Sequence, residues 1–289
     1  ARPLAGLLPD RLRNMLKLAP RRPSGTATRP GIYPATGPRR MRVALLNGCV
    51  QSVVEDSINA ATVRLLTRHG VEVVVSKGAR CCGALEHHLG HLAPARTAAA
   101  ASIRAWCAEI DGQGLDAIVA NTSGCGTLVK DYGHLFREDP ALAADATRVS
   151  ALAGDVSEIL ATLPLKFEGR RALRVAYHSA CSLQHAQRIT AQPMKLLRDA
   201  GFDVRQPAES HLCCGSAGSY NILQPEIAGT LRDRKCANLA ALRPEAICAG
   251  NVGCLIQIRS GTSVPVMHTV ELLDWATGGP APEGLAAGR

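Results

Sequence analysis

The sequence predicts an α/β protein built from two tandem, duplicated domains, each with a parallel sheet. The first observation behind this fold class is an internal repeat: three cysteine positions recur at an offset of 132 residues and a fourth at 129, and Arg-Val-Ala precedes both copies. The second is the alternation of strand-like and helix-like segments in each copy. Strand, helix, strand in succession makes the strands parallel, because each connection crosses back over the sheet.

The expected elements follow the same order in both copies. In the first copy, a buried apolar strand at 42–47 and a β-branched strand at 71–75 flank a helix at 58–69 with helical apolar spacing. An alanine-rich helix at 94–110 and a third strand at 117–121 come next. The second copy is expected to have strands at 174–178, 202–205 and 246–249, and helices at 193–200 and 222–241.

Charge and proline separate the start of the chain from the rest. Residues 1–42 hold ten of the 33 basic residues and one acid, so the remainder has 23 of each sign, and seven of the 17 prolines lie in the same stretch. We expect a basic, proline-rich linker at 1–40, the repeats at 41–165 and 166–279, and a flexible tail at 280–289.

A short amphipathic helix is expected at 9–18. We interpret this helix as a connector to a part of the protein that precedes it in the sequence, in preference to a segment that docks to a partner or to a membrane surface. The arginine-rich, acid-poor start also resembles a transit peptide, although the sequence begins at Ala1 without a methionine and could be a fragment.

Composition removes two classes of function. A body with balanced charge and 3% aromatic residues is a poor surface for nucleic acid. No apolar run approaches the roughly 18 to 20 residues of a membrane helix. Nothing indicates secretion, so we expect a soluble, cytoplasmic protein.

The repeated cysteines indicate two soft-metal sites. Four of them each follow the carboxyl end of an expected strand, where α/β sheets place their sites. Adjacent cysteines are about 3.8 Å apart at Cα, too close for a relaxed disulfide at roughly 4.4 to 6.8 Å, so metal binding is favoured. Cys107, Cys236 and Cys248 do not recur and are interpreted as buried apolar residues. The candidate ligands form a first cysteine set (Cys49, Cys81, Cys82 and Cys125) and a second cysteine set (Cys181, Cys213, Cys214 and Cys254).

This Cys…Cys-Cys-Gly…Cys pattern resembles the Rossmann-like, cysteine-rich CCG domains of heterodisulfide reductase B subunits and of iron–sulfur subunits of flavin-linked dehydrogenases. Segments 122–126, 183–187, 210–218 and 251–254 are most similar to the glycolate oxidase iron–sulfur subunit family, and the resemblance covers nearly all of 41–277. It implies an electron-transfer subunit with iron–sulfur clusters. It also implies FAD-binding partner subunits that oxidise glycolate to glyoxylate, a ferredoxin-like acceptor or domain, and delivery of electrons to a membrane or quinone acceptor, with peripheral association at the inner membrane.

The sequence departs from this family in two ways. The full pattern closes with Cys-x-x-Cys, but Thr122 and Asn251 stand where its first cysteine would be, so each site has four thiols. A four-cysteine cluster such as 4Fe–4S and a four-cysteine zinc site at one of the positions both stay open. The family's N-terminal ferredoxin-like domain has Cys-x-x-Cys-x-x-Cys runs, and no such run occurs here; either this sequence begins after that domain or the domain is missing.

Glycines and histidines complete the candidate sites. Gly83 and Gly215 follow the cysteine pairs and are expected to form tight turns that bring the backbone close to a cofactor. His178, His185 and His211 lie near the second set only; they could donate to cluster sulfurs, supply a ligand or shuttle protons, and we take His211 as the cofactor-contact candidate. Rival functions are a lactate- or glycerol-phosphate-oxidising complex, a heterodisulfide-type thiol reductase, and a zinc-binding scaffold.

Overall fold

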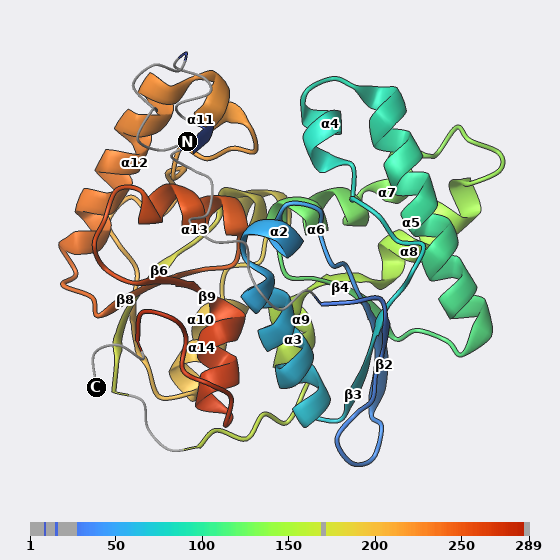
Figure 1. The fold of residues 1–289 in the computed structure, drawn as a ribbon, viewed down its shortest axis with the longest axis horizontal. Coiled ribbons are helices and arrows are strands. Elements are labelled where there is room, and N and C mark those ends of the chain that lie inside the picture. Colours follow the sequence, from blue (N-terminus) through green and yellow to red (C-terminus); the bar gives the residue numbers. More distant parts are fainter. Residues whose placement is uncertain (1–8, 10–14, 17–27, 169–171, 286–289) are drawn as a thin grey trace.

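Two α/β repeats lie side by side in the computed structural model, which describes residues 9, 15–16, 28–168 and 172–285 (Figure 1). The helix expected at 9–18 therefore falls almost wholly outside the described residues. The strands of the first repeat are β1 (Gly31–Tyr33), β2 (Met41–Leu45), β3 (Val71–Val75), β4 (Ala117–Ala120) and β5 (Ala153–Asp155). Those of the second are β6 (Arg174–His178), β7 (Asp203–Arg205), β8 (Ala246–Ala249) and β9 (Val266–His268).

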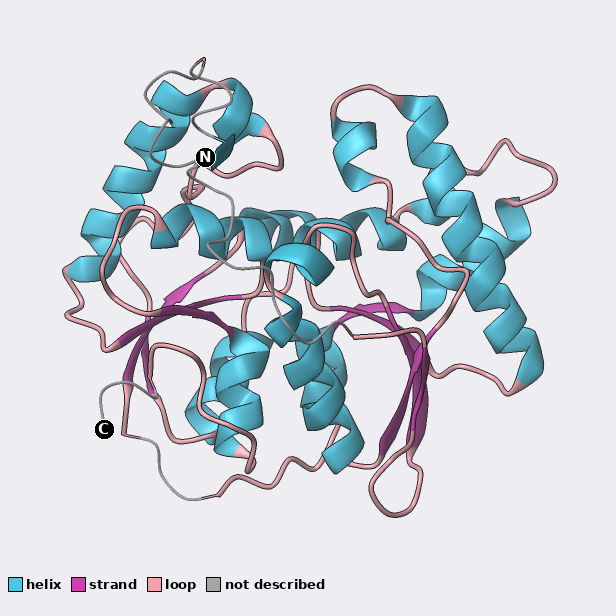
Figure 2. Cartoon of the chain, in the orientation of Figure 1, coloured by secondary structure: helices cyan, strands magenta, loops and turns pink. Residues whose placement is uncertain are grey.

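Helices follow the strands in both repeats (Figure 2). The first repeat has α2 (Gln51–Val54), α3 (Asp56–Arg68), α4 (Ala84–His88), α5 (Leu92–Gly112), α6 (Ser123–Lys130), α7 (Tyr132–Leu135), α8 (Ala143–Leu152) and α9 (Val156–Ala161). The second has the π-helix η2 (Ser182–Ala186), α10 (Gln192–Asp199), α11 (Tyr220–Leu223), α12 (Pro225–Ala240), α13 (Val252–Arg259) and α14 (Thr269–Ala276). In the described part of the chain, no helix has both the length and the hydropathy needed to cross a bilayer.

The sheet topology confirms the expected duplication. The first sheet has the strand order β1-β3-β2-β4-β5 and the second β7-β6-β8-β9, so the last four strands of one sheet correspond in order to the four of the other. All these pairings are parallel except that of β1, which pairs antiparallel with β3. The chain is an α/β protein of two tandem repeats.

The described end of the proline-rich segment is attached to the first sheet. Ile32 of β1 pairs with Val74 of β3. The backbone N–H of Thr28 donates to Oδ2 of Asp56 at 2.9 Å, and Asn47 Nδ2 donates to the Thr28 carbonyl at 3.1 Å. Residues 28–33, inside the stretch expected as linker, therefore form part of the first repeat's structure.

One expected helix was wrong in its extent. The segment 222–241 is two helices, α11 and α12, separated at Gln224. Pro225 has no N–H and restricts the residue before it to extended backbone, so it suits the first position of a new helix and cannot continue an old one. The first of the two helices, α11, follows the loop that carries the second set's cysteine pair, and the N–H of Asn221 donates to the Ser216 carbonyl in that loop at 3.3 Å.

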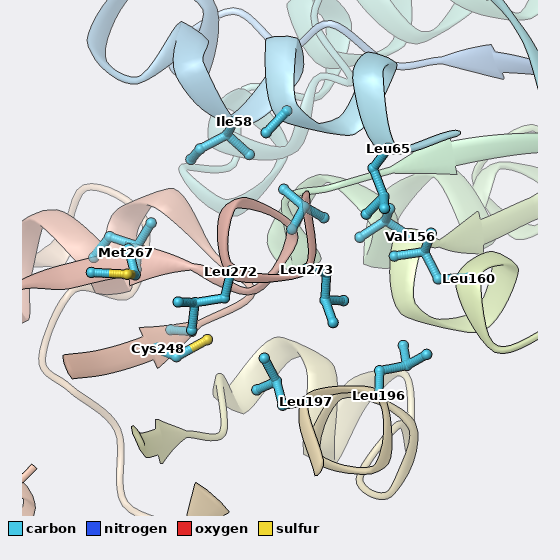
Figure 3. Packing of buried hydrophobic residues seen from close by; sticks show 14 of the residues in the cluster. Ile58, Leu65, Val156, Leu160, Leu196, Leu197, Cys248, Met267, Leu272 and Leu273 are labelled. Atoms are coloured by element: carbon cyan, nitrogen blue, oxygen red, sulfur yellow. The ribbon is translucent and has the colours of Figure 1, made fainter. Parts of the chain in front are cut away.

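The core joins the two repeats. Helices α3 and α9 of the first repeat pack against α10 and α14 of the second between the two sheets. Figure 3 shows Leu65, Val156, Leu196 and Leu273 from these four helices facing one another, and all four are buried. Because each such side chain contributes roughly 1.5–3 kcal/mol on burial, this shared layer holds the repeats in one orientation.

An ion pair closes the same interface. Asp274 of α14 is 1% exposed and accepts hydrogen bonds from Arg64 Nε at 2.8 Å and from Arg68 Nη1 at 2.9 Å, both on α3. The two sets of strand ends therefore have a fixed relation to each other, with the cysteine loops on the same side of the molecule (Figure 1).

Candidate metal centres

Each cysteine set lies beyond the carboxyl ends of its own sheet's central strands. Cys49 follows β2 and Cys125 lies in the first turn of α6, just after β4. Cys181 follows β6, and Cys254 lies in the first turn of α13, just after β8. All eleven cysteines are free thiols. Of these, Cys125 and Cys254 lie at the amino ends of α6 and α13.

The thiols of the first set form a continuous row of contacts. Cys49 Sγ and Cys81 Sγ are 3.1 Å apart, and this hydrogen bond lowers the pKa of Cys81 while raising the pKa of Cys49. Cys82 interacts with Cys125 and with Cys81, and both hydrogen bonds, together with burial, raise the pKa of Cys82. The structure thus brings together all four residues that the sequence repeat singles out here.

The second set repeats this row. A hydrogen bond with Cys181 lowers the pKa of Cys213 and raises that of Cys181. Cys214 interacts with Cys213 and Cys254. The Cys214 hydrogen bond, helped by the nearby His178, lowers the pKa of Cys254 to about 6 although burial opposes the change. The four thiols of the second set therefore contact one another in the same order along the chain as the four thiols of the first set.

A left-handed glycine turn places each cysteine pair. Gly83 has φ of 85° and Gly215 has φ of 90°, and a Cβ on Gly83 would lie 2.7 Å from the carbonyl oxygen of Ala95. A Cβ on Gly215 would overlap the corresponding carbonyl of Ala228. Only glycine suits both the backbone angle and the close approach.

The turn also aims a backbone donor at sulfur. The N–H of Gly83 donates to Cys81 Sγ at 3.4 Å, and that of Gly215 donates to Cys213 Sγ at 3.3 Å. A hydrogen bond to a thiolate stabilises its charged form. This geometry accords with the turn expected from sequence; contact of either glycine with a cofactor stays a prediction.

Thr122 and Asn251 stand directly before α6 and α13, and of the two only the Asn251 side chain caps its helix. Asn251 Oδ1 accepts a hydrogen bond at 3.2 Å from the N–H of Gly253, which caps α13. The hydroxyl of Thr122 donates to Gln51 Oε1. Both side chains thus have structural partners where the full family pattern has a thiol.

The three histidines differ in their surroundings. His178 is buried beside the second set, with one ring nitrogen within 4.8 Å of the sulfurs of Cys214 and Cys254. His211 is exposed, and its carbonyl oxygen lies 3.3 Å from His185 Nε2. His178 is therefore the histidine that the structure brings to the thiols, while the role expected for His211 stays untested.

Sequence reasoning missed two groups that hold the cysteine loops. Tyr132, buried, donates from its hydroxyl to the carbonyl of Cys82 at 2.8 Å. Lys235, 1% exposed, donates from Nζ to the carbonyls of Glu209 at 2.7 Å and Ser210 at 3.5 Å, and burial lowers the pKa of Lys235. Lys235 lies seven residues after Ala228, as Ser102 lies seven residues after Ala95, and Ala228 and Ala95 are the residues whose carbonyls face Gly215 and Gly83, so Lys235 and Ser102 occupy corresponding positions.

The cysteines that do not recur lie in apolar surroundings. Cys107, Cys236 and Cys248 are all buried among core residues. Their sulfurs approach backbone carbonyls or, for Cys248, the hydroxyl of Thr269 at 3.3 Å. Burial raises the pKa of each thiol. These residues have the environment of small apolar side chains.

The donor chemistry of both sets fits a thiophilic metal group. Each set is a row of four sulfurs in pairwise contact, and none of them is in a disulfide. In each row a backbone N–H donates to the sulfur of Cys81 or Cys213, whose pKa is lowered. Iron–sulfur clusters and structural zinc both take four thiolates. Fold and sites together define a two-domain α/β protein with one four-thiol centre in each domain.

The chain belongs to the family of cysteine-rich domains called CCG, which matches residues 43–130 and 175–259. It is 39% identical to the glycolate oxidase iron-sulfur subunit of Escherichia coli over 238 residues, covering 82% of this chain and 58% of that protein. It is 28% identical to lactate utilization protein A of Bacillus licheniformis over 243 residues, covering 81% of this chain and 99% of that protein.

A solved structure shares the fold. A hypothetical protein from Helicobacter pylori superimposes with a TM-score of 0.57 over 96% of this chain and 55% of that one, at 12% sequence identity. At this identity the likeness concerns architecture alone.

Proposed function

We propose that this chain is the iron–sulfur electron-transfer subunit of a flavin-linked complex that oxidises glycolate to glyoxylate. The observation that carries the proposal is the pair of four-thiol rows, each set by the same glycine turn at the carboxyl ends of a sheet. The similarity to the Escherichia coli iron–sulfur subunit supports the choice of complex. The chain spans 58% of that relative, so activity, substrate and partners all belong to the proposal.

The residues of this chain bind and tune the centres in this proposal. When bound, iron–sulfur clusters supply one-electron carriers between a two-electron flavin and an acceptor. The eight repeated cysteines hold them, and the N–H groups of Gly83 and Gly215 donate to coordinated sulfur. Hydroxyacid oxidation takes place on FAD-binding partner subunits, where glycolate gives up two electrons and two protons.

Exposed apolar side chains beside the first set suit a docking surface. Val50 and Val53 are 42% and 59% exposed and lie one and four residues after Cys49. Leu89 and Leu92, between α4 and α5, are 44% and 55% exposed. We assign this face to a permanent partner, and the onward route to a ferredoxin-like domain or protein and a membrane or quinone acceptor. The chain would then work in the cytoplasm, with peripheral membrane association through its complex.

A lactate-oxidising complex is the second candidate. The chain covers 99% of lactate utilization protein A, although at lower identity. The same centres would serve that complex, and the substrate would be set by the partner. Glycolate is preferred here because the identity to the glycolate oxidase subunit is higher over a similar share of this chain.

The test starts with metal content. Chain produced anaerobically should contain iron and acid-labile sulfide with visible absorption, whereas zinc alone would overturn the iron–sulfur assignment in favour of a zinc scaffold. Tagged chain should then co-purify with FAD-binding subunits from its own organism, and glycolate should reduce the flavin of that complex. Reduction by lactate but not glycolate would move the assignment to the second candidate.

Cysteine variants test which thiols hold the centres. Cys81→Ser and Cys213→Ser should each remove about half of the bound iron, because each breaks one row of contacts. Cys107→Ser and Cys236→Ser, in the core and away from the rows, should leave iron content unchanged. Equal losses from all four variants would contradict the assignment of ligands, as measured by iron and sulfide per chain.

A further inference from the structure

The second centre has a nitrogen donor that the first does not. His178 is the last residue of β6 and is 1% exposed. One of its ring nitrogens and the sulfurs of Cys214 and Cys254 all lie within 4.8 Å of one another. Ligands of one zinc or iron ion bind at roughly 2.0–2.3 Å, so modest side-chain rotation brings this group onto a common metal.

The imidazole has no other partner to explain its burial. Within the described residues, neither Nδ1 nor Nε2 of His178 has a nitrogen or oxygen partner, and the polar group with which the ring interacts is the thiol of Cys254. A buried polar group without a hydrogen bond costs about 1–3 kcal/mol, so a fold rarely retains one without a ligand or another compensating contact. The thiols of Cys214 and Cys254 are close enough to bind the same metal as His178.

The first repeat shows that the fold itself does not require a polar residue here. The 132-residue offset that relates the cysteines places Leu46 at the position of His178. Leu46 is 3% exposed and its N–H joins the sheet by donating to the carbonyl of Val119 at 2.9 Å. An apolar side chain therefore satisfies this site in the first repeat, and the histidine is an addition specific to the second.

We propose that His178 binds the metal group of the second centre through a ring nitrogen, which makes that centre mixed thiolate and imidazole while the first is all thiolate. This inference rests on the proposed function only in that it requires a bound metal. His178 stands where the first repeat has Leu46, so the neutral imidazole adds to the four thiolates of the second set and replaces none of them. The two centres then carry the same ligand charge and differ in the number and kind of their donors.

The test compares His178→Leu, which copies the first repeat, with the unaltered chain. X-ray absorption at the edge of whichever metal is bound detects the outer scattering of a coordinated imidazole. Pulsed electron paramagnetic resonance of reduced chain, with ¹⁵N-labelled histidine, detects nitrogen coupled to an iron–sulfur centre. Both signals should be present in the unaltered chain and in Cys81→Ser, which lacks the first centre, and absent from His178→Leu.

Two further variants separate ligation from other roles. His185→Leu removes a histidine that the structure places against a backbone carbonyl, and it should keep the imidazole signal. His178→Cys should retain the metal while losing the nitrogen signal, because sulfur replaces nitrogen as donor. If His178→Leu fails to fold, this variant still reports on the ligand.

The outcomes distinguish this inference from the proposed function. Metal bound by the second set without any imidazole signal, or a signal that survives both His178 variants, overturns the ligation. Zinc in place of iron overturns the electron-transfer function. X-ray absorption at the zinc edge then still tests whether His178 binds the metal. Chain that binds no metal in either set overturns both.

Discussion

The two cysteine sets have the same skeleton and different surroundings. Both are rows of four thiols, with a glycine N–H donating to the first sulfur of the adjacent pair. Cys49 is exposed where Cys181 is half-buried, and Cys125 is half-buried where Cys254 is buried. The second set also has a buried histidine and lies near a buried lysine, at positions occupied in the first copy by leucine and serine.

This difference separates what the duplicated fold requires from what each copy can change. The glycine turn is restricted by backbone sterics, since any Cβ would meet a helix carbonyl. Side chains around the thiols have no such restriction, because leucine and histidine fit the same strand end. A duplicated domain can thus keep two metal sites while giving each its own exposure and charge.

The largest expected effect comes from the turn. Gly83→Ala and Gly215→Ala should each deplete metal from their own repeat, because positive φ costs roughly 1–2 kcal/mol and the overlap with Ala95 or Ala228 adds to it. Metal per chain should fall by about half in each variant and almost completely in the double variant.

Gly229→Ala is the matched control for these variants. Gly229 lies in α12 with open space where its Cβ would be, so alanine there should keep the metal and stabilise the helix by about 0.5–1 kcal/mol. Full metal retention by either turn variant would break the supposed equivalence of the two turns.

A second prediction concerns the contribution of the ion pair between the two repeats to the free energy of unfolding. Asp274→Asn should lower the free energy of unfolding by about 2 kcal/mol, because it removes the charge that accepts hydrogen bonds from Arg64 and Arg68 across the interface. Chemical denaturation of apo chain under reducing conditions measures this. Asp199→Asn, which breaks an exposed pair with Lys195, should change stability by less than about 0.5 kcal/mol. Equal effects would argue against a stabilising role for the interface pair.

The smallest expected effect concerns the caps of the two inner helices. Asp155 caps α9 and His268 caps α14, each with a reciprocal glutamate bond. Burial raises the pKa of Asp155 from 3.8 to about 6 and lowers the pKa of His268 from 6.5 to about 4. The unfolded chain thus binds more protons than the folded chain at His268, and fewer at Asp155, which gives the two caps opposite pH dependence.

Between pH 7 and pH 5.5 each cap should change stability by about 1 kcal/mol. Acidification removes stability through His268 and adds it through Asp155, so the two nearly cancel in the unaltered chain. Relative to that chain, His268→Asn should gain stability at the lower pH and Asp155→Asn should lose it, as measured by urea unfolding. Parallel slopes in both variants would contradict the assignment.

Strong local patterns predicted the central strands and the longer helices, whereas shorter helices such as α6, α9, α13 and α14 were not predicted. The β-branched run of β3 and the apolar runs of β6 and β8 have the bounds expected from sequence. Three short strands, β1, β5 and β9, were missed. The sequence of β5 is Ala-Gly-Asp, which has little intrinsic preference for a strand, and it becomes one by pairing with β4. Such elements depend on a neighbour that is distant in the chain.

The sequence by itself determined the duplication, the eight repeated thiols and the need for glycine after each cysteine pair, because repeats, spacing and backbone restriction are local properties. Only the tertiary structure decided which sulfurs touch, that α3, α9, α10 and α14 form one layer, and that His178 and not His211 lies beside the thiols. These depend on where strand ends and loops meet in space, and sequence separation does not report that distance.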